Sequence, residues 1–496
     1  MIVRPFLLNR RAAIFCGLAA TALAAGCTVG PNYKRPAAPV PANWQVQEPW
    51  RQAEPRDTVP KTEWWTLFHD EELNSLETDL LAANQTLKVS VAHFEQARAS
   101  AAVQNATLFP TVTAGPAASV ERYSGNRPTG STIAPSPVTQ GNFNLPFSVS
   151  YEVDLFGQRR RTIEAAQAAY QANAADLENV RLVLTAELAA DYFTLRQFDS
   201  EIGILKRTVE TLQKGLDLVQ SRHSGGIASG LDVAQEETLL NSTRTQAILL
   251  QQQRKQFEDA IAVLVGKPAP DFHLASHELA AEPPRVDTTI PSDVLERRPD
   301  IAESERQMAI ANAQIGIAKA AFYPSLTLYG QGGWNSQRIS QLLNAESGFW
   351  AVGANVAQDI FSGGALHAQV EYSQAGYNAT VANYRDTVLN AFREVQDNIT
   401  GLEVLEAAKQ SQSDAVGSAR KQVDIATSRY VGGLVNYLDV VSAQQNLLSN
   451  EQEAAIIQGQ RLVTSVLLVK ALGGGWDAAS LAAVHVKPQL KDLVRQ

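Results

Sequence analysis

Cysteine and long apolar runs are scarce in this sequence of 496 residues. One of its two cysteines, Cys16, lies in an N-terminal segment that we expect to be removed, so the mature chain keeps only Cys27. A single cysteine excludes an intramolecular disulfide. After residue 27, no apolar stretch reaches the roughly 20 residues that a membrane-spanning helix needs. A mature chain that enters a bilayer must therefore do so through β-strands or a lipid.

Basic residues are also few: the formal net charge is −9, and charged residues make up 19% of the sequence. An acidic chain is repelled by the phosphate backbone, which excludes nucleic acid as a partner. The abundance of alanine, glutamine and leucine is instead typical of long helices that pack closely.

Motifs of enzyme chemistry are missing as well. The seven histidines are scattered, and His273 and His277 lie in a proline-rich segment where surface positions are expected. The stretch HELAA at 277–281 lacks the second histidine of a metalloprotease motif. GQGGW at 330–334 lacks the lysine of a phosphate-binding loop. We therefore expect no catalytic site, no metal and no cofactor apart from a covalent lipid.

The first 26 residues have the pattern of a secretory signal peptide, with three arginines, a short apolar run and small residues at its end. A retained anchor helix is the alternative, although the run from Ala12 to Gly26 is short for one. Leu23–Cys27 resembles the lipobox of bacterial lipoproteins. This resemblance implies cleavage before Cys27, lipidation of Cys27 and, with Thr28 next, sorting to the outer membrane. An unmodified Cys27 is the alternative.

The rest of the chain repeats itself. SRHSGGIASGLDV at 221–233 aligns without gaps with SRYVGGLVNYLDV at 428–440, 207 residues later. Such a repeat fixes the internal symmetry of a fold. We expect a signal peptide at 1–26, a proline-rich lipidated tether at 27–62, a first structural repeat at 63–270, a linker at 271–290, a second repeat at 291–475 and a C-terminal tail at 476–496.

Each repeat is expected to contain two long helices joined by a tight glycine turn. The first helix runs from about Arg159 to His223 without a proline, and a helix of that length reaches about 100 Å. Lys409 and Gln412 occupy core-equivalent positions in the second repeat, so we expect looser or wetter packing there. Four heptads of apolar residues indicate a coiled coil in the first helix: Leu195, Phe198, Ile202, Leu205, Val209, Leu212, Leu216 and Val219.

Segments before each long helix alternate like β-strands, from Phe143 to Leu155 in the first repeat and from Trp350 to Val356 in the second. Their length and alternation favour membrane strands over half-buried strands of a soluble sheet. Pro146 argues against a central strand and indicates a bulge or a rim. The chain offers about four strands, whereas the smallest single-chain barrels use eight, so a barrel requires several copies.

Three stretches resemble the outer membrane factor family of Gram-negative bacteria, in its TolC/OprM-type lipoprotein branch: GCTVGPNYKRP at 26–36, EWWTLFHDEELNSL at 63–76 and the block from Ile290 to Leu328. The resemblance implies a mainly α fold with a membrane β-barrel. It implies a homotrimer in which four strands per protomer form a twelve-stranded β-barrel and long antiparallel coiled-coil helices form a periplasmic α-barrel.

The resemblance also implies a function and a place. The trimer would sit in the outer membrane, contact its lipid, extend into the periplasm and dock on a periplasmic adaptor and an inner-membrane RND-type transporter. It would conduct drugs and toxic compounds out of the cell without converting them. A duct of the same fold for another cargo, such as secreted proteins or oligosaccharides, is one alternative, and a periplasmic coiled-coil scaffold without a pore is another.

The helical tips are the expected gate. Two glycine pairs, Gly225–Gly226 and Gly432–Gly433, permit the positive φ angles of tight turns. Asp232 and Asp439 fall in the first turn of each return helix, where a carboxylate stabilises the helix N-terminus.

The match to the family implies specific roles at these tips. Tyr430 and Arg429 would tether to Asp232 on the neighbouring hairpin. Asp439 would line the pore as part of a cation-selective ring, and Leu438 would narrow it. Two residues of the first hairpin, Arg222 and Leu231, complete the expected gate.

Overall fold

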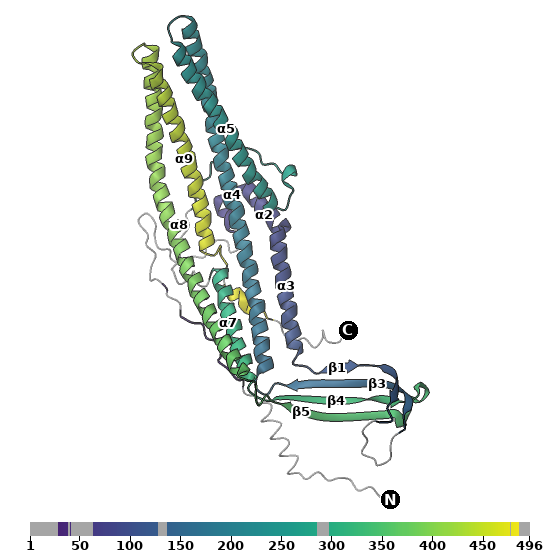
Figure 1. Cartoon of the computed structure of the whole chain (residues 1–496). Coiled ribbons are helices and arrows are strands. Elements are labelled where there is room, and N and C mark those ends of the chain that lie inside the picture. The colour runs from purple at the N-terminus through teal and green to yellow at the C-terminus, as the bar shows by residue number, and fades with distance from the viewer. Residues whose placement is uncertain are drawn as a thin grey trace.

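The computed structural model describes residues 28–37, 40, 63–126, 136–284, 297–476 and 478–485. Two long helical hairpins, α4 with α5 and α8 with α9, run away from one end of a β-sheet (Figure 1). The signal peptide and Cys27 lie outside the described residues. In chain order the elements are η1 (Trp64–Phe68), α2 (Glu71–Ala83), α3 (Gln85–Ala106), β1 (Thr111–Ala114), β2 (Ala117–Tyr123), β3 (Val138–Val153), α4 (Gln158–Ser224), α5 (Gly230–Leu264), η2 (Ala269–Asp271), α7 (Pro299–Ala320), β4 (Ser325–Ser336), η3 (Ile339–Gln341), η4 (Ala345–Ser347), β5 (Gly348–Ala357), α8 (Ala365–Val431), α9 (Tyr437–Ala471) and η5 (Ala478–Ala483).

The two halves of the chain share one plan, which confirms the internal duplication. α4 and α8 each have 67 residues, α5 and α9 each have 35, and α3 and α7 each have 22. Both long helices begin directly after a left-handed glycine, Gly157 (φ 84°) and Gly364 (φ 88°). The observed ends of α4 differ from the predicted ones by a single residue at each end.

The heptad residues of α4 face the helical core as predicted. Leu205, Leu212 and Val219 have no exposed surface, and most of the others are buried. In the second hairpin the packing is polar where Lys409 and Gln412 replace apolar residues. Gln412 donates to the main-chain and side-chain oxygens of Asn450 at 2.9 and 3.0 Å, and Lys409 pairs with Glu282 at 3.0 Å. The expected wetter seam is therefore a hydrogen-bonded one. No helix in the described part of the chain has both the length and the apolar character that membrane crossing requires.

One antiparallel sheet joins the two repeats, with the strand order β1-β3-β4-β5. β2 pairs with β3 in the same register as β1, since Ala114 faces Phe147 and Ala117 faces Asn144. β1 and β2 therefore form one lane, the first lane, with a break between them. The sheet has four lanes, as expected. Within the described residues, the first lane and β5 are each paired along one edge only.

Pro146 lies inside β3, which is paired with a strand on each side. The expectation that this proline argues against a central strand was therefore wrong, and it does not mark a rim. Proline has no N–H to donate to a neighbouring strand. The break between β1 and β2 lies opposite it on one side, and Gly333 of β4 faces it on the other. A Cβ on Gly333 would overlap the carbonyl of Leu145. A break and a glycine thus accommodate the proline within the sheet.

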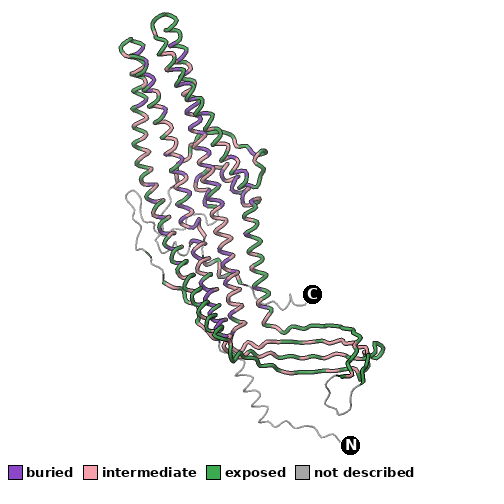
Figure 2. Tube along the Cα trace, viewed as in Figure 1, coloured by how far each residue is buried: buried purple, intermediate pink, exposed green. Residues whose placement is uncertain are grey.

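No residue of the five strands is buried (Figure 2). One face of the sheet carries large exposed apolar side chains. Trp350, Val352 and Val356 on β5 and Val120 on β2 are between 66% and 79% exposed. A strand of a soluble sheet buries one of its faces against a core. The half-buried soluble alternative is therefore excluded within this chain.

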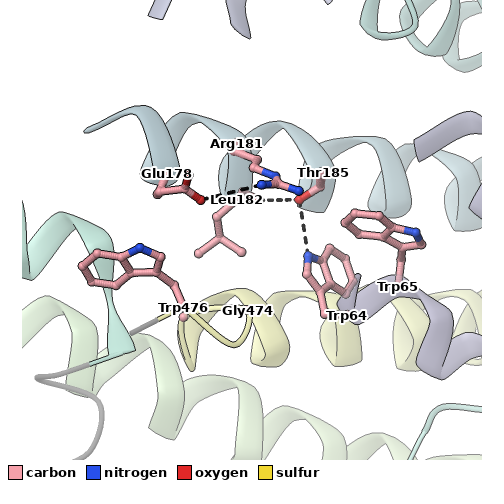
Figure 3. Close-up of a pocket in the computed structure, with 9 residues that line it drawn as sticks. Trp64, Trp65, Glu178, Arg181, Leu182, Thr185, Gly474 and Trp476 are labelled. Atoms are coloured by element: carbon pink, nitrogen blue, oxygen red, sulfur yellow. Dashed lines mark hydrogen bonds and ion pairs between the residues drawn. The ribbon is translucent and has the colours of Figure 1, made fainter. Parts of the chain in front are cut away.

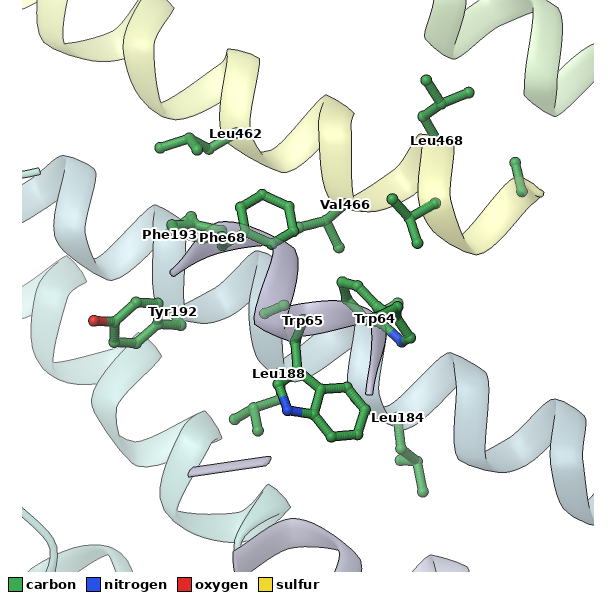
Figure 4. Close-up of a cluster of buried hydrophobic side chains, with 14 of the residues drawn as sticks. Trp64, Trp65, Phe68, Leu184, Leu188, Tyr192, Phe193, Leu462, Val466 and Leu468 are labelled. Carbon is green, nitrogen blue, oxygen red and sulfur yellow. The ribbon is translucent and has the colours of Figure 1, made fainter. Parts of the chain in front are cut away.

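The helices are held together midway along their length by an aromatic cluster (Figure 4). Trp64, Trp65 and Phe68 of η1 insert between α4 and α9, and the Phe68 and Phe193 rings lie 4.9 Å apart. The indole N–H of Trp64 donates to Thr185 at 3.3 Å, which satisfies its only polar group. Buried aromatic side chains of this size contribute several kcal/mol each to stability, roughly 25 cal/mol per Å² of apolar surface.

A buried ion network, the belt network, joins α2, α4, α5 and the linker. Arg196 of α4 pairs with Asp199 at 2.7 Å and with Glu72 of α2, and donates to the carbonyl of Ala275 at 2.7 Å. Arg254 of α5 reaches Asp199 at 2.6 Å. The described part of the predicted linker is therefore packed against the helices. His277 is exposed, as expected, and bonds to Glu72 at 2.9 Å.

The described start of the predicted tether, residues 28–37, is held along α4 and α7; we call it the strap. Arg161 of α4, 3% exposed, donates to the carbonyls of Val29 and Gly30 at 3.3 and 3.2 Å. Gly30 packs so closely on Gly316 of α7 that a Cβ would come within 2.5 Å of its Cα. Asn312 donates to the carbonyl of Pro31 at 3.0 Å. These contacts fix the strap, so it is not a free chain.

Candidate functional site at the hairpin tips

Both hairpin turns end their first helix in the same way. Gly226 N–H donates to the His223 carbonyl at 2.9 Å, and Ile227 N–H to the Arg222 carbonyl at 2.8 Å. This pair of bonds is a Schellman motif, and the second turn repeats it at Gly433 and Leu434. Only the second glycine of each predicted pair has a positive φ, Gly226 at 74° and Gly433 at 71°. Gly225 and Gly432 have φ of −79° and −74°, so the turn geometry alone does not require glycine there.

The two return helices begin differently, although each has the predicted aspartate in its first turn. Ser229 caps α5: its hydroxyl accepts from the N–H of Asp232 at 3.2 Å, and the Asp232 carboxylate accepts from the N–H of Ser229 at 3.0 Å. This capping box gives Asp232 a structural role. Asn436 at the start of α9 makes no side-chain cap, and Asp439 is exposed. The Asp439 side chain is therefore open to solvent.

The tips of the two hairpins pack on each other through a small apolar core, the tip cluster. It takes residues from all four long helices. The buried members are Leu212, Leu216 and Val219 of α4, Leu239 and Leu240 of α5, Tyr430 of α8, and Tyr437, Val440 and Val441 of α9. Because this cluster is the contact between the tips, any change of their spacing must rearrange it.

Two tyrosines and an arginine lie at the end of the tip cluster. The Arg222 guanidinium stands over the Tyr430 ring at 5.0 Å, and the Tyr430 and Tyr437 rings meet edge to face at 4.8 Å. A cation over an aromatic face contributes about 0.5–1 kcal/mol when exposed and more when desolvated. Burial, and then the charge of Asp232, raise the pKa of Tyr430.

The predicted tether is not formed within this single chain. No hydrogen bond or ion pair joins Asp232 to Tyr430 or Arg429 in the described residues, and the Tyr430 hydroxyl has no hydrogen-bond partner there. Asp232 acts on Tyr430 only through its charge. The tether therefore stays a prediction for the assembled protein.

The two predicted gate leucines point outward, Leu231 with 66% and Leu438 with 50% of its surface exposed. Leu231 lines a groove between α5 and α9, along with Thr238, Ser242 and Gln445. The groove is open and its walls combine apolar and amide side chains, so it favours a packing partner over a small ligand.

Sequence reasoning missed Glu236, which lies one turn beyond Asp232 on α5. Its side chain has no exposed surface, and it contacts Gly215 of α4 and Tyr437 of α9. The spacing of Glu236, Leu240, Thr243 and Ala247 is that of a helix core face. An acidic residue at such a position was the signal that could have identified it.

A second hollow, far from the tips, is lined by the tryptophans of η1 and by Trp476 (Figure 3). Its volume is about 70 Å³. Glu178 and Arg181 on its rim face each other at 3.9 Å, and Thr185 accepts the indole N–H of Trp64. Its polar groups are thus directed at one another, and it forms part of the helical core.

Three comparisons place this architecture among known proteins. The profile of the family described as "Outer membrane efflux protein" matches residues 76–267 and 290–474. The chain is 31% identical over 475 residues to the probable efflux pump outer membrane protein SepC of Pseudomonas putida, covering 94% of this chain and 98% of SepC. It is 32% identical over 463 residues to the antibiotic efflux pump outer membrane protein ArpC of Pseudomonas putida, covering 92% and 95%. The crystal structure of the Campylobacter jejuni CmeC outer membrane channel superposes with a TM-score of 0.85 at 25% identity, covering 91% of this chain and 96% of CmeC.

Proposed function

The chain belongs to the outer membrane efflux protein family, and from this premise we propose that three copies form the exit duct of a tripartite efflux pump. It is an outer membrane channel protein whose helical hairpins extend into the periplasm. The observation that supports the duct is a sheet with an outward apolar face and two open edges, attached to paired long hairpins. A periplasmic adaptor and an inner-membrane RND-type transporter are the proposed partners.

Closure of the barrel requires the open edge of β5 to pair with the first lane of the next copy. Three copies of four lanes give twelve strands, which lies within the range of membrane barrels. An unpaired edge cannot stay exposed in lipid, where each unsatisfied backbone group costs several kcal/mol.

The repeat fixes how these edges meet. The first lane of the first repeat corresponds to β4 of the second, and β3 corresponds to β5. Thr111 of the first lane faces Ser150 of β3, just as Ser325 of β4 faces Ala357 of β5. Corresponding residues of the first lane and β4 are therefore 214 positions apart. The same comparison gives a spacing of 207 from β3 to β5, which is also the spacing from α4 to α8. The contact between β3 and β4 inside the chain is therefore a template for the contact between copies.

Applied to the observed pair Leu145–Trp334, the two spacings place Val352 of one copy opposite Val120 of the next. The neighbouring pair Asn144–Asn335 gives Ala351 opposite Glu121. Val352 and Val120 both lie on the outward apolar face and are largely exposed in the single chain. A register shifted by one residue would instead turn one apolar face inward.

Cysteine pairs test this register. Directly opposite Cα atoms in antiparallel strands are about 4.5 or 5.5 Å apart, and both distances permit a disulfide. We expect oxidised V352C/V120C or A351C/E121C protein to run as covalent dimers and trimers. The control pair V352C/S119C places its two side chains on opposite faces and should give no such ladder, and neither should any single variant.

The outcomes separate two ideas. An assembled trimer that gives no ladder from either pair refutes the register, whereas a chain that never assembles refutes the duct itself. Conductance of the purified trimer in planar bilayers is the direct test of the duct, and absence of current would refute it.

The proposed cargo consists of drugs and other toxic compounds, because relatives are named for antibiotic efflux and for efflux pumps. Drug susceptibility of a deletion strain tests this: unchanged susceptibility with a conducting trimer would favour another cargo.

At the tips we propose that Asp439 forms a ring of three carboxylates that selects for cations, and that Leu438 narrows the opening. We propose that Tyr430 and Arg429 hold the closed state through Asp232, with Arg222 and Leu231 supporting this contact. D439N should reduce cation selectivity in the bilayer measurement. D232A combined with Y430F should raise single-channel conductance, and an unchanged value would refute the tether. For Cys27 we propose lipidation, which mass spectrometry of the mature N-terminus can check.

A further inference from the structure

Glu236 is a buried carboxyl group at the contact between the two hairpins. It projects from α5 into the tip cluster, and its residue has no exposed surface. A Cβ on Gly215 of α4 would overlap its carboxyl group, so the absence of a side chain at position 215 makes the space that it occupies. The hydroxyl of Tyr437, at the first turn of α9, lies next to this carboxyl and also close to Gly215. The carboxyl thus touches the first hairpin and the second.

The Glu236 carboxyl lacks the partners that a buried charge needs. Neither oxygen has a hydrogen-bond partner of good geometry in the described residues, and no lysine or arginine pairs with it there. The titratable group that faces it is Tyr437 of α9, which in turn interacts with Tyr430 of α8 and Asp232 of α5. The nearby cation of α4, Arg222, is stacked on the Tyr430 ring. An ionised Glu236 would therefore be a buried and uncompensated charge, which is strongly unfavourable.

Burial raises the pKa of Glu236 to about 7, and the Tyr437 hydroxyl offsets only part of the rise. Since the pKa in the packed tips lies above the ordinary value of 4.5, protons favour the packed state. The stabilisation is fully present below the ordinary value and is lost as pH rises through about 7.

We propose that Glu236 is a proton-dependent latch between the two hairpins, closed when the carboxyl is neutral and released when it ionises. A neutral carboxyl fits the apolar tip cluster beside the Tyr437 hydroxyl. An ionised one draws water into the cluster and separates α5 from the start of α9. The latch is distinct from Asp232, whose carboxylate takes part in the capping box of α5, and from Asp439, which is exposed.

Amide hydrogen exchange on the purified full-length protein tests the latch without any current measurement. Protection factors for the first two turns of α9, corrected for intrinsic exchange rates, are compared between about pH 5 and about pH 8.5, on either side of the raised pKa. We expect protection to fall at the higher pH by up to roughly 70-fold, because at pH 5 part of the roughly 300-fold limit set by the difference between 4.5 and about 7 is already lost.

Two variants make this result decisive. E236Q keeps the shape but cannot ionise, so its protection should not depend on pH. E237Q changes the adjacent residue, which is exposed, and should behave like the unmodified protein. Protection that is independent of pH in the unmodified protein, or equally dependent in E236Q, would overturn the latch.

A second readout rests on the proposed duct function. Open probability in bilayers should rise with periplasmic pH through about 7 in the unmodified trimer and in E237Q, and much less in E236Q. A trimer without any current would refute the duct but leave the exchange result to decide the latch. A current with the same pH response in E236Q would refute the latch alone.

Discussion

Removal of Arg196 should destabilise the protein more than any surface arginine, because it is the centre of the belt network. Arg196→Ala deletes the bond to Asp199 (2.7 Å), the bond to the Ala275 carbonyl (2.7 Å) and the ion pair with Glu72. The side chains of Arg196 and Asp199 are 1% and 0% exposed, so water cannot replace the lost partner.

The expected loss of stability depends on the partners that Asp199 keeps in the Arg196→Ala variant. Breaking a buried ion pair by removing one partner costs about 3–5 kcal/mol. Asp199 keeps Arg254 and Ser276, each at 2.6 Å, which places the expected loss near the lower limit, about 3 kcal/mol. Such a loss changes the unfolding equilibrium constant more than 100-fold, at about 1.4 kcal/mol per factor of ten.

Denaturant unfolding of the purified protein in detergent measures this loss, and the tryptophan fluorescence of Trp64 and Trp65 in the nearby core reports it. The matched control is Arg207→Ala, which removes an exposed pair with Glu278 and should cost less than about 1 kcal/mol. Equal unfolding midpoints for the two variants would refute the reasoning.

The pH dependence of stability tests the contribution of Glu72 to the same network. Partial burial acts to raise its pKa, but His277 and Arg196 outweigh this and lower it, so the stabilisation from Glu72 should be lost as pH falls through the acid range.

Two further substitutions test the strap and the α5 cap. Gly316→Ala would bring a Cβ to 2.9 Å from the Arg161 side chain, which holds the strap, so limited proteolysis should cut the strap faster, whereas Gly376→Ala, with open space around it, should leave the cutting rate unchanged. Ser229→Ala should cost about 1 kcal/mol of stability in the first turn of α5, because the capping box is lost. Asn436→Ala, which removes no side-chain cap, should show a smaller increase in amide exchange at its own helix start, and equal increases would contradict the capping argument.

Local periodicity and the repeat made much of this fold predictable. The heptads of α4 and the alternation of β3 each need only neighbouring residues, and a fixed spacing then transfers them to the second half. The turns at Gly226 and Gly433 were recognised in the same way. Which glycine of each pair takes the positive φ was not, because the Schellman geometry depends on where the preceding helix ends.

Contacts between distant residues could not be predicted. Arg196 and Glu72 are 124 positions apart, and Tyr33 of the strap meets Glu305 at a separation of 272. Such partners leave no periodic pattern, so the belt network and the packing of the strap escaped sequence reasoning. Pro146 misled it for a related reason: the features that accommodate a proline lie on the two neighbouring strands.

The equal lengths of α4 and α8 set the distance between the β-sheet and the hairpin tips. One added heptad would move a tip by about 10 Å. An insertion in α4 alone would break the pairing with α5, and an insertion in one hairpin alone would pull the tip cluster apart. Four helices must therefore lengthen or shorten together. The distance that this protein bridges can change over evolution only in coordinated steps, whereas exposed residues along the same helices can be replaced one at a time.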